Sequence, residues 1–290
     1  MSLMCSENVT LRCHESMNHS YNLDDLKYLM KRLREPEFGC PWDIKQDFNT
    51  IIPYTIEECY EVIDAIENQQ WQHLSVELGD LLFQIIFYSE MADEQCLFNL
   101  DQVVDQLVKK LITRHPHVFP DQQLHDRCLI KPSDQQIAAS WETIKQQERE
   151  QKGQLDQRQA KVLDDIPRAL PALSRAQKMQ KRAANVGFDW ADLTPVIAKI
   201  EEELAELKEA LQGGNIDEIR DEMGDVLFSQ VNLARHLNVN AEQALRATNE
   251  KFTRRFNFVE EQVVKSEQDW SQYSLDSLEQ FWLDAKKAGL

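Results

Sequence analysis

Five acidic side chains lie at helical spacing in the second half of the chain: Glu202, Glu203, Glu206, Glu222 and Asp225. An α-helix advances about 100° per residue, so side chains three residues apart lie on one face, one turn above each other. Glu203 pairs with Glu206 in this way, and Glu222 pairs with Asp225. Each pair therefore offers two carboxylates to the same neighbouring group.

A glycine-rich segment separates the two pairs. Gly213, Gly214 and Asn215 are typical of a helix end followed by a chain reversal. We expect antiparallel helices on either side with their acidic faces opposed, so that four or five carboxylates converge. Such a cluster is costly unless a cation neutralises it, and an all-oxygen site suits Mg²⁺ or Mn²⁺ better than zinc or copper.

The acidic pattern occurs twice in the chain. Each of the five residues has a counterpart 145 positions earlier, as Glu57 precedes Glu202. A single Glu-x-x-Glu pair is more often a solvated helix face than a metal site, but a constellation repeated in register rarely arises by chance. We therefore interpret the repeat as an internal duplication. The counterparts are Glu57, Glu58, Glu61, Glu77 and Asp80.

A pair of cations and a tryptophan recur with the acids. Lys251 and Arg255 are four residues apart and point the same way on a predicted helix, and Trp282 lies near the C-terminus. Such cations can neutralise the phosphates that Mg²⁺ recruits, and a tryptophan can stack on a base. A water bound to the metal can attack phosphorus. Seen alone, the cations also fit a helix-surface pair and the tryptophan a core residue. The earlier copies, 141 positions before, are Lys110, Arg114 and Trp141.

The composition restricts partners and compartment. With 50 acidic against 32 basic residues, the formal net charge of −18 disfavours nonspecific binding to nucleic acid or anionic membranes. Six cysteines include no C-x-x-C pair, which indicates a reducing compartment. No apolar run reaches the roughly 18 residues of a membrane span. We therefore expect a cytoplasmic protein without nucleic-acid or membrane partners.

The composition predicts a mostly helical chain. Only 8 glycines in 290 residues, with abundant Gln, Glu, Leu and Ala, predict an all-α protein, and the duplication divides it into two tandem helical-bundle domains. We predict a disordered leader at 1–21, an N-terminal domain at 22–131, a helical arm and linker at 132–171 and a C-terminal domain at 172–290. Helices are expected over 22–34, 71–93, 100–115, 172–185 and 216–237, and two more open at Pro53 and Pro195.

Further motifs accompany the acidic pattern Glu-Glu-x-x-Glu followed by Glu-x-Gly-Asp. Together they closely resemble the MazG family of tandem-domain bacterial nucleoside triphosphate pyrophosphohydrolases, from about Asn22 to the C-terminus. The motifs are Gly39-Cys40-Pro41-Trp42-Asp43, His115-Pro116-His117-Val118-Phe119, Ile166-Pro167, Asn185-Val186-Gly187-Phe188-Asp189-Trp190 and Asn249-Glu250-Lys251-Phe252.

The resemblance implies an activity and a set of site residues. It implies all-α bundles that pair in a homodimer and Mg²⁺-dependent hydrolysis of NTPs or dNTPs between the α and β phosphorus atoms, which yields a monophosphate and pyrophosphate. It places the main activity in the second domain, where five acids are the expected catalytic residues and the last four of them the metal ligands: Glu202, Glu203, Glu206, Glu222 and Asp225. The implied substrate-binding residues are Lys178, Lys181, Arg182, Trp190, Lys251, Arg255 and Trp282. The matching residues of the N-terminal copy are Glu58, Glu61, Glu77 and Asp80 for metal, and Lys110, Arg114 and Trp141 for substrate.

Two other functions compete with this interpretation. A non-catalytic, nucleotide-sensing protein would bind nucleotides and present the segment 133–159 to a partner. A redox dimetal bundle of the ferritin type would need Glu-x-x-His pairs, but here the third position after each glutamate is acidic, which favours hard cations. The base and sugar preference, the general base and the activity of the first half stay open at this point. Removal of aberrant nucleotides or lowering of nucleotide alarmones is implied by the family alone.

Overall fold

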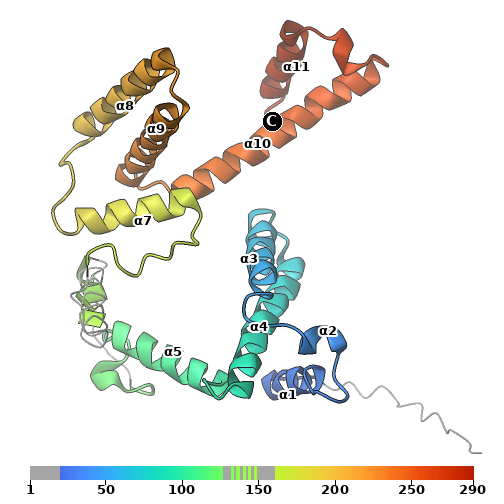
Figure 1. Cartoon of the computed structure of the whole chain (residues 1–290), viewed down its shortest axis with the longest axis vertical. Coiled ribbons are helices and arrows are strands. Elements are labelled where there is room, and N and C mark those ends of the chain that lie inside the picture. Colours follow the sequence, from blue (N-terminus) through green and yellow to red (C-terminus); the bar gives the residue numbers. More distant parts are fainter. Residues whose placement is uncertain are drawn as a thin grey trace, which may run out of the picture. The chain divides into compact units, whose positions relative to one another are not determined.

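The computed structural model describes residues 20–126 and 161–290, and between them 132–133, 135–137, 140–141, 143–144 and 147–148. Within these residues the chain forms helices and no strand, which confirms the all-α prediction (Figure 1). The chain divides into two compact units, Met1–Lys145 and Gln146–Leu290. Most of the predicted leader 1–21 and much of the predicted arm 132–171 lie outside the described residues, so those boundaries stay predictions. Among the described helices, none combines the length and apolar composition needed to cross a bilayer.

The first unit is built on the antiparallel helix pair α3 and α4. Helix α1 packs on α4, and α5 follows α4 and contacts it. Buried side chains from α1, α4 and the start of α5, together with Ile51 before α3, form one apolar core: Met30, Ile51, Ile86, Phe87, Met91 and Leu100. The elements are α1 (Leu23–Leu33), α2 (Pro41–Ile44), α3 (Ile52–Glu67), α4 (Trp71–Glu94), α5 (Leu100–Arg114) and the 3₁₀ turn η1 (Pro120–Gln122).

Local sequence explains where the first helices begin. Asn22 caps α1, because its Oδ1 accepts hydrogen bonds from two backbone N–H groups of the first turn. Pro41 opens α2, so the motif that begins at Gly39 continues into a single helical turn. Trp42 of this turn is 48% exposed and meets Tyr54 edge-on, with the ring centroids 5.7 Å apart. It is therefore a surface aromatic rather than a core residue.

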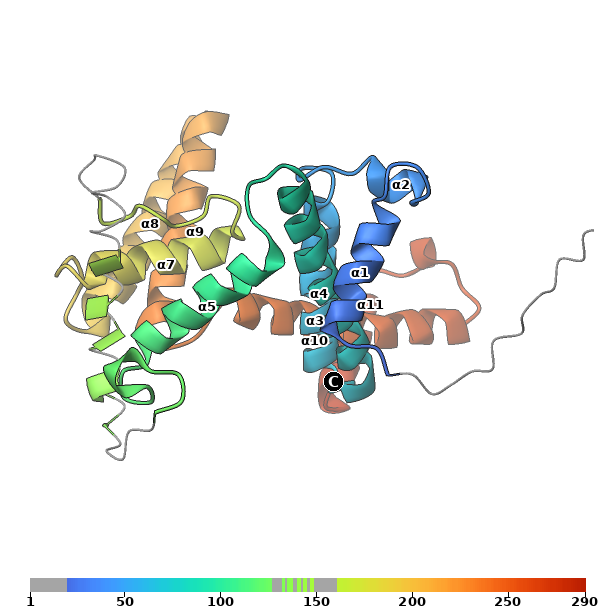
Figure 2. The ribbon, with the colours of Figure 1, turned by 90° about the horizontal axis from the view of Figure 1, so that it is seen from below.

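The second unit repeats the helix pair and adds a long arm. Helix α8 packs along α9, α7 lies against α9, and α10 begins next to α7 and α9. Figures 1 and 2 show α10 running away from these helices to the place where α11 folds back on it. The elements are α7 (Ala172–Ala184), α8 (Leu193–Gly213), α9 (Ile216–His236), α10 (Ala241–Lys265), the 3₁₀ turn η2 (Trp270–Gln272) and α11 (Leu275–Lys287).

A side-chain cap fixes the start of α8, and a glycine fixes its end. The prediction that Pro195 opens this helix was wrong by two residues, because Asp192 Oδ1 accepts from the backbone N–H of Thr194 at 2.9 Å and caps an earlier turn. At the other end Gly214 adopts φ 71° and stops the helix, as predicted. Asn215 then caps α9, which reverses the chain within two residues.

Candidate active site

Three carboxylates of the second unit meet between α8 and α9. Glu203 of α8 and Glu222 and Asp225 of α9 each offer a ligand oxygen, and these oxygens all lie within 4.8 Å of one another. Glu203 is only 6% exposed, because its neighbours on the same helix face, Leu207 among them, are buried against α9. The predicted convergence of the two acidic faces is present in this hairpin.

Glu206 completes this group, called here the carboxylate cluster (Glu203, Glu206, Glu222 and Asp225). Desolvation, a hydrogen bond with Glu203 and the charges of Glu203 and Glu222 raise the pKa of Glu206. Desolvation raises the pKa of Glu222 as well, followed by the charges of Asp225 and Glu203. Glu222 Oε2 is buried and accepts no hydrogen bond within the described residues. The cluster thus holds excess negative charge and an unpaired buried oxygen.

Lys199 lies beside the cluster and was not predicted. Its Nζ is 2.7 Å from Glu202 Oε1 and 2.8 Å from Glu203 Oε1, and these two carboxylates raise the pKa of Lys199. Glu202, predicted as a catalytic residue, therefore faces Lys199 rather than the other acids. The spacing of three and four residues between Lys199 and the glutamates was the signal in the sequence that could have identified this ion-pair group.

A cavity of about 630 Å³ adjoins the carboxylate cluster. Its wall includes Glu203 and Asp225, so the cavity and the cluster share side chains. Helices α7, α8 and α9, the turn before α8 and Leu163 of the segment before α7 supply the rest of the wall, which is mainly apolar. The lining residues of the helices and the turn are Met179, Gln180, Ala183, Gly187, Phe188, Asp189, Trp190, Val196, Lys199, Phe228, Ser229, Asn232 and Arg235.

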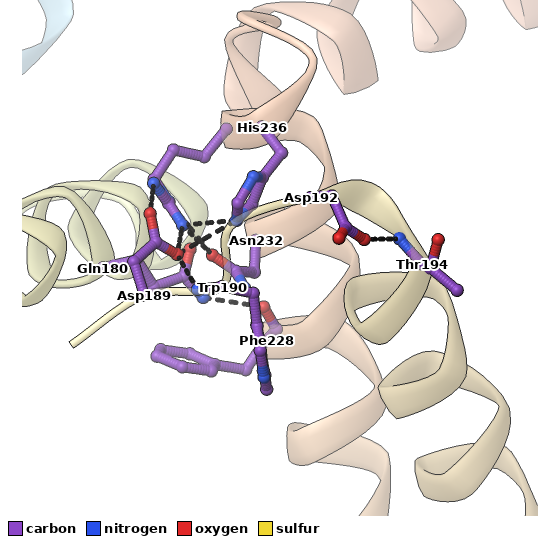
Figure 3. A network of polar contacts seen from close by, with 9 residues as sticks. Gln180, Asp189, Trp190, Asp192, Thr194, Phe228, Asn232 and His236 are labelled. Carbon is purple, nitrogen blue, oxygen red and sulfur yellow. Dashed lines mark hydrogen bonds and ion pairs between the residues drawn. The ribbon is translucent and has the colours of Figure 1, made fainter. Parts of the chain in front are cut away.

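A polar network fixes the turn at one side of this cavity. Arg235 Nη1 donates to Asp189 Oδ2 at 2.9 Å, and His236 Nε2 and the backbone N–H of Trp190 each lie 3.0 Å from Asp189 Oδ1. The hydrogen bond from Arg235 lowers the pKa of Asp189. Figure 3 shows Asp189, Asn232 and His236 joined in this network. Trp190, a predicted substrate-binding residue, is thereby held in the cavity wall.

The three predicted cations of α7 do not line the cavity. Lys178 and Lys181 are exposed. Arg182 donates instead to the backbone carbonyls of Val162, at 3.3 Å, and Asp164. This helix contributes Met179, Gln180 and Ala183 to the cavity wall, whereas Arg182 ties α7 to the preceding segment.

The structure brings Arg255 and Trp282 together, but away from the carboxylates of the same chain. The Arg255 guanidinium lies 5.6 Å from the centre of the Trp282 ring, and its Nε donates to the backbone carbonyl of Leu290 at 2.8 Å. Lys251 is exposed on the same helix. At 1.5 Å per residue, Arg255 lies about 21 Å along α10 from Ala241, where α10 begins next to α7 and α9.

The first unit contains a similar cluster. Ligand oxygens of Glu58, Glu77 and Asp80 lie within 4.8 Å of one another. Desolvation, followed by the charges of Asp80 and Glu61, raises the pKa of Glu58. The predicted substrate residues of this unit lie elsewhere: Lys110 and Arg114 are on α5, and Trp141 meets His115 edge-on, with the ring centroids 5.3 Å apart.

Comparison with known proteins assigns this arrangement to a family. Residues 46–119 and 193–259 match the MazG nucleotide pyrophosphohydrolase domain, once in each unit. A "Nucleoside triphosphate pyrophosphohydrolase" of Escherichia coli K12 is 47% identical over 267 residues, which cover 91% of this chain and 97% of that protein. A "Nucleoside triphosphate pyrophosphohydrolase/pyrophosphatase MazG" of Thermotoga maritima is 41% identical over 263 residues, with 91% and 95% covered. The chain therefore belongs to the MazG nucleotide pyrophosphohydrolase family.

Proposed function

We propose that the second unit hydrolyses nucleoside triphosphates, with ribose or deoxyribose, between the α and β phosphorus atoms. The products are a nucleoside monophosphate and pyrophosphate. The observation that carries this proposal is the carboxylate cluster beside a cavity of about 630 Å³, whose wall includes Glu203 and Asp225 of the cluster. A cluster of this kind suits a metal and the phosphates that the metal binds, and the cavity lies within the size range of small-molecule sites, roughly 300–1,000 Å³.

Mg²⁺, with Mn²⁺ as the alternative, is the cofactor that the donor set fits. The donors are carboxylate oxygens, and the buried unpaired Oε2 of Glu222 fits a position that needs a positive partner. Glu203, Glu206, Glu222 and Asp225 would hold the ion. When bound, it supplies charge neutralisation on phosphate oxygens and a water with a lowered pKa.

The cations of the chain would bind the phosphates. Lys199 is already held beside Glu203 at 2.8 Å and can donate to a phosphate oxygen there. Lys251, Arg255 and Trp282, which match the substrate residues of the family, lie on the arm formed by α10 and α11. They do not lie in the cavity wall of the same chain.

We further propose a homodimer in the cytoplasm. Exposed apolar side chains on α8 and α9, such as Ile197 (46% exposed), Leu211 (57%) and Leu227 (49%), support association with a second copy. A second copy can also bring its arm to the carboxylate cluster. As the biological role we propose control of nucleotide pools, by removal of aberrant nucleotides or in stress, by analogy at the level of the family.

The products of a single turnover test the proposal. Incubation of an NTP and Mg²⁺ with the full chain in H₂¹⁸O, followed by ³¹P NMR and mass spectrometry, should yield pyrophosphate and a monophosphate that carries ¹⁸O. Orthophosphate as the first product would show cleavage at the γ position and contradict the proposal. Tight nucleotide binding without any turnover would favour the nucleotide-sensing alternative.

A further inference from the structure

Three carboxylates of the first unit, called here the first-unit cluster, converge between α3 and α4. They belong to Glu58, Glu77 and Asp80, and their ligand oxygens lie within 4.8 Å of one another. Glu77 is only 5% exposed. Burial of a carboxylate is costly unless a positive partner lies beside it, so the surroundings of this cluster decide what it can bind.

Among the described residues, little positive charge compensates the first-unit cluster. In the second unit Lys199 Nζ lies 2.8 Å from Glu203 Oε1, but at the offset of 145 residues Tyr54 takes the place of Lys199. His73 Nδ1 lies 3.0 Å from Glu77 Oε1, yet the side chain of His73 is 62% exposed, so water screens this contact. The first-unit cluster therefore favours a bound cation.

A buried carboxamide lies one turn further along the same face of α4. Gln84 follows Asp80 by four residues and Glu77 by seven, so the three side chains share one face of the helix. Helical side chains lean toward the N-terminus of their helix, so Gln84 extends toward Asp80. Gln84 is 7% exposed, and its Oε1 is buried and accepts no hydrogen bond from the described residues. A buried acceptor without a partner is unfavourable, which indicates that a donor or a cation is missing at this oxygen.

The second unit keeps open space where the first unit has Gln84. The residue at the offset of 145 is Ser229, which lines the cavity and whose Oγ donates to the backbone carbonyl of Val226 at 2.9 Å. One turn further on, Phe87 replaces Asn232 of the cavity wall, and Phe87 is 1% exposed in the apolar core of the first unit. Side-chain atoms of the first unit thus fill positions that border the cavity in the second.

We propose that Gln84 completes a closed divalent-cation site in the first unit, with Glu58, Glu77 and Asp80 as the other protein ligands. Ca²⁺ takes about six to eight oxygen ligands, including glutamine carbonyl oxygens, in flexible geometry. Mg²⁺ instead keeps several waters and is usually bound together with substrate phosphates. A site that offers a buried carboxamide oxygen in place of open space therefore suits Ca²⁺ in a structural role.

Calorimetric titration with Ca²⁺ in the absence of nucleotide locates the ion. The full chain that carries Glu203→Gln is the starting protein, because this change disables the carboxylate cluster of the second unit and leaves the first-unit cluster intact. This chain should bind one Ca²⁺, and the further change Glu58→Gln should abolish the binding. Absence of Ca²⁺ binding in the Glu203→Gln chain, or unchanged binding after Glu58→Gln, would overturn the proposal.

The variant Gln84→Met tests the carboxamide ligand, because it keeps the length of the side chain and removes the oxygen. In the Glu203→Gln chain it should weaken Ca²⁺ binding about tenfold or more. Eu³⁺ can replace Ca²⁺ at such sites, and its luminescence lifetimes in H₂O and D₂O should then report about one additional bound water. Gln72→Met, at an exposed position of the same helix, is the matched control and should change neither quantity. An unchanged affinity and an unchanged number of waters in Gln84→Met would show that Gln84 does not contact the ion.

The variant Gln84→Glu separates metal ligation from packing. It keeps the shape of the side chain and adds a negative charge to the cluster, so the thermal midpoint of the metal-free Glu203→Gln chain should fall. Ca²⁺ should then raise this midpoint by more than it raises that of the chain with Gln84. An equal rise in both chains would show that Gln84 only packs, and would overturn the proposal. None of these measurements uses a nucleotide, so a failure to hydrolyse NTPs would refute the proposed function without affecting this test.

Discussion

The variant Glu203→Gln tests the proposed metal site most directly. Glu203 is the most buried member of the carboxylate cluster, at 6% exposed, and the amide keeps its size while removing its charge. A ligand oxygen lies about 2.1 Å from Mg²⁺. At that separation, charges of +2 and −1 attract by about 4 kcal/mol even at the dielectric constant of water. Because Glu203 is buried, we take this as a lower bound, which corresponds to Mg²⁺ binding weakened about a thousandfold.

Two measurements follow from this magnitude. Calorimetric titration of the substrate-free protein with Mg²⁺ should lose its signal in Glu203→Gln, and pyrophosphate release should require about a thousandfold more Mg²⁺. The helical circular dichroism should persist, because Lys199, at 2.8 Å from Glu203, can still donate to the amide oxygen. Glu209→Gln, an exposed position on the same helix, is the control with the same loss of charge and should behave like the parent. A parental Mg²⁺ dependence in Glu203→Gln would show that the cluster is not the metal site.

Gly214→Ala should lower the free energy of unfolding by about 1 kcal/mol, because the φ of 71° strains any side chain, and an unchanged thermal midpoint would count against the glycine cap. In metal-free protein, the raised pKa of Glu206 and of Glu222 favours protonation in the folded state. Denaturant titrations should therefore show the free energy of unfolding falling as the pH rises from about 4.5 through the raised pKa, and Mg²⁺ should remove this fall. A free energy of unfolding that rises over this pH window would refute the crowding of charge. Asp189→Asn should lower the free energy of unfolding by about 1 kcal/mol at neutral pH, because it removes the ion pair with Arg235, which solvent partly screens. Because the pKa of Asp189 lies below the usual 3.8, this stability is present above pH 3.8 and is lost as the pH falls. The free energy of unfolding of the variant should therefore change less with pH in acid than that of the parent. The same pH dependence in both proteins would contradict the ion pair.

The carboxylate cluster was predictable because it depends on local rules. Three-residue spacing sets a helix face, and glycine followed by asparagine sets a reversal, so Glu203 and Asp225 could be placed opposite each other from sequence alone. The contents of the cavity were not predictable in this way. Whether space stays open depends on side-chain sizes from three helices at once, such as Asn232 in one copy against Phe87 in the other.

The position of the arm formed by α10 and α11 also could not be predicted from the sequence. Spacing shows that Lys251 and Arg255 share a face of α10. It does not show where that face lies relative to the carboxylate cluster, because the direction of a 25-residue helix is set by packing at its first turns. Arg182 illustrates the opposite case. Its charge and position suggested phosphate binding, yet it donates to backbone carbonyls that only the folded chain brings to it.

The short stretch of chain between the two acidic pairs makes the carboxylate cluster sensitive to chain length. Adding one residue within α9, between Ile216 and Glu222, would turn the rest of that helix by about 100° relative to its first turn and carry Glu222 and Asp225 away from Glu203. Both copies keep the same separation here, since Glu61 precedes Glu77 by as many residues as Glu206 precedes Glu222. The shift of offset from 145 to 141 occurs only after the second acidic helix of each copy. The two copies thus differ in length on one side of this helix and agree on the other, a relation that substitution of single acids would never reveal.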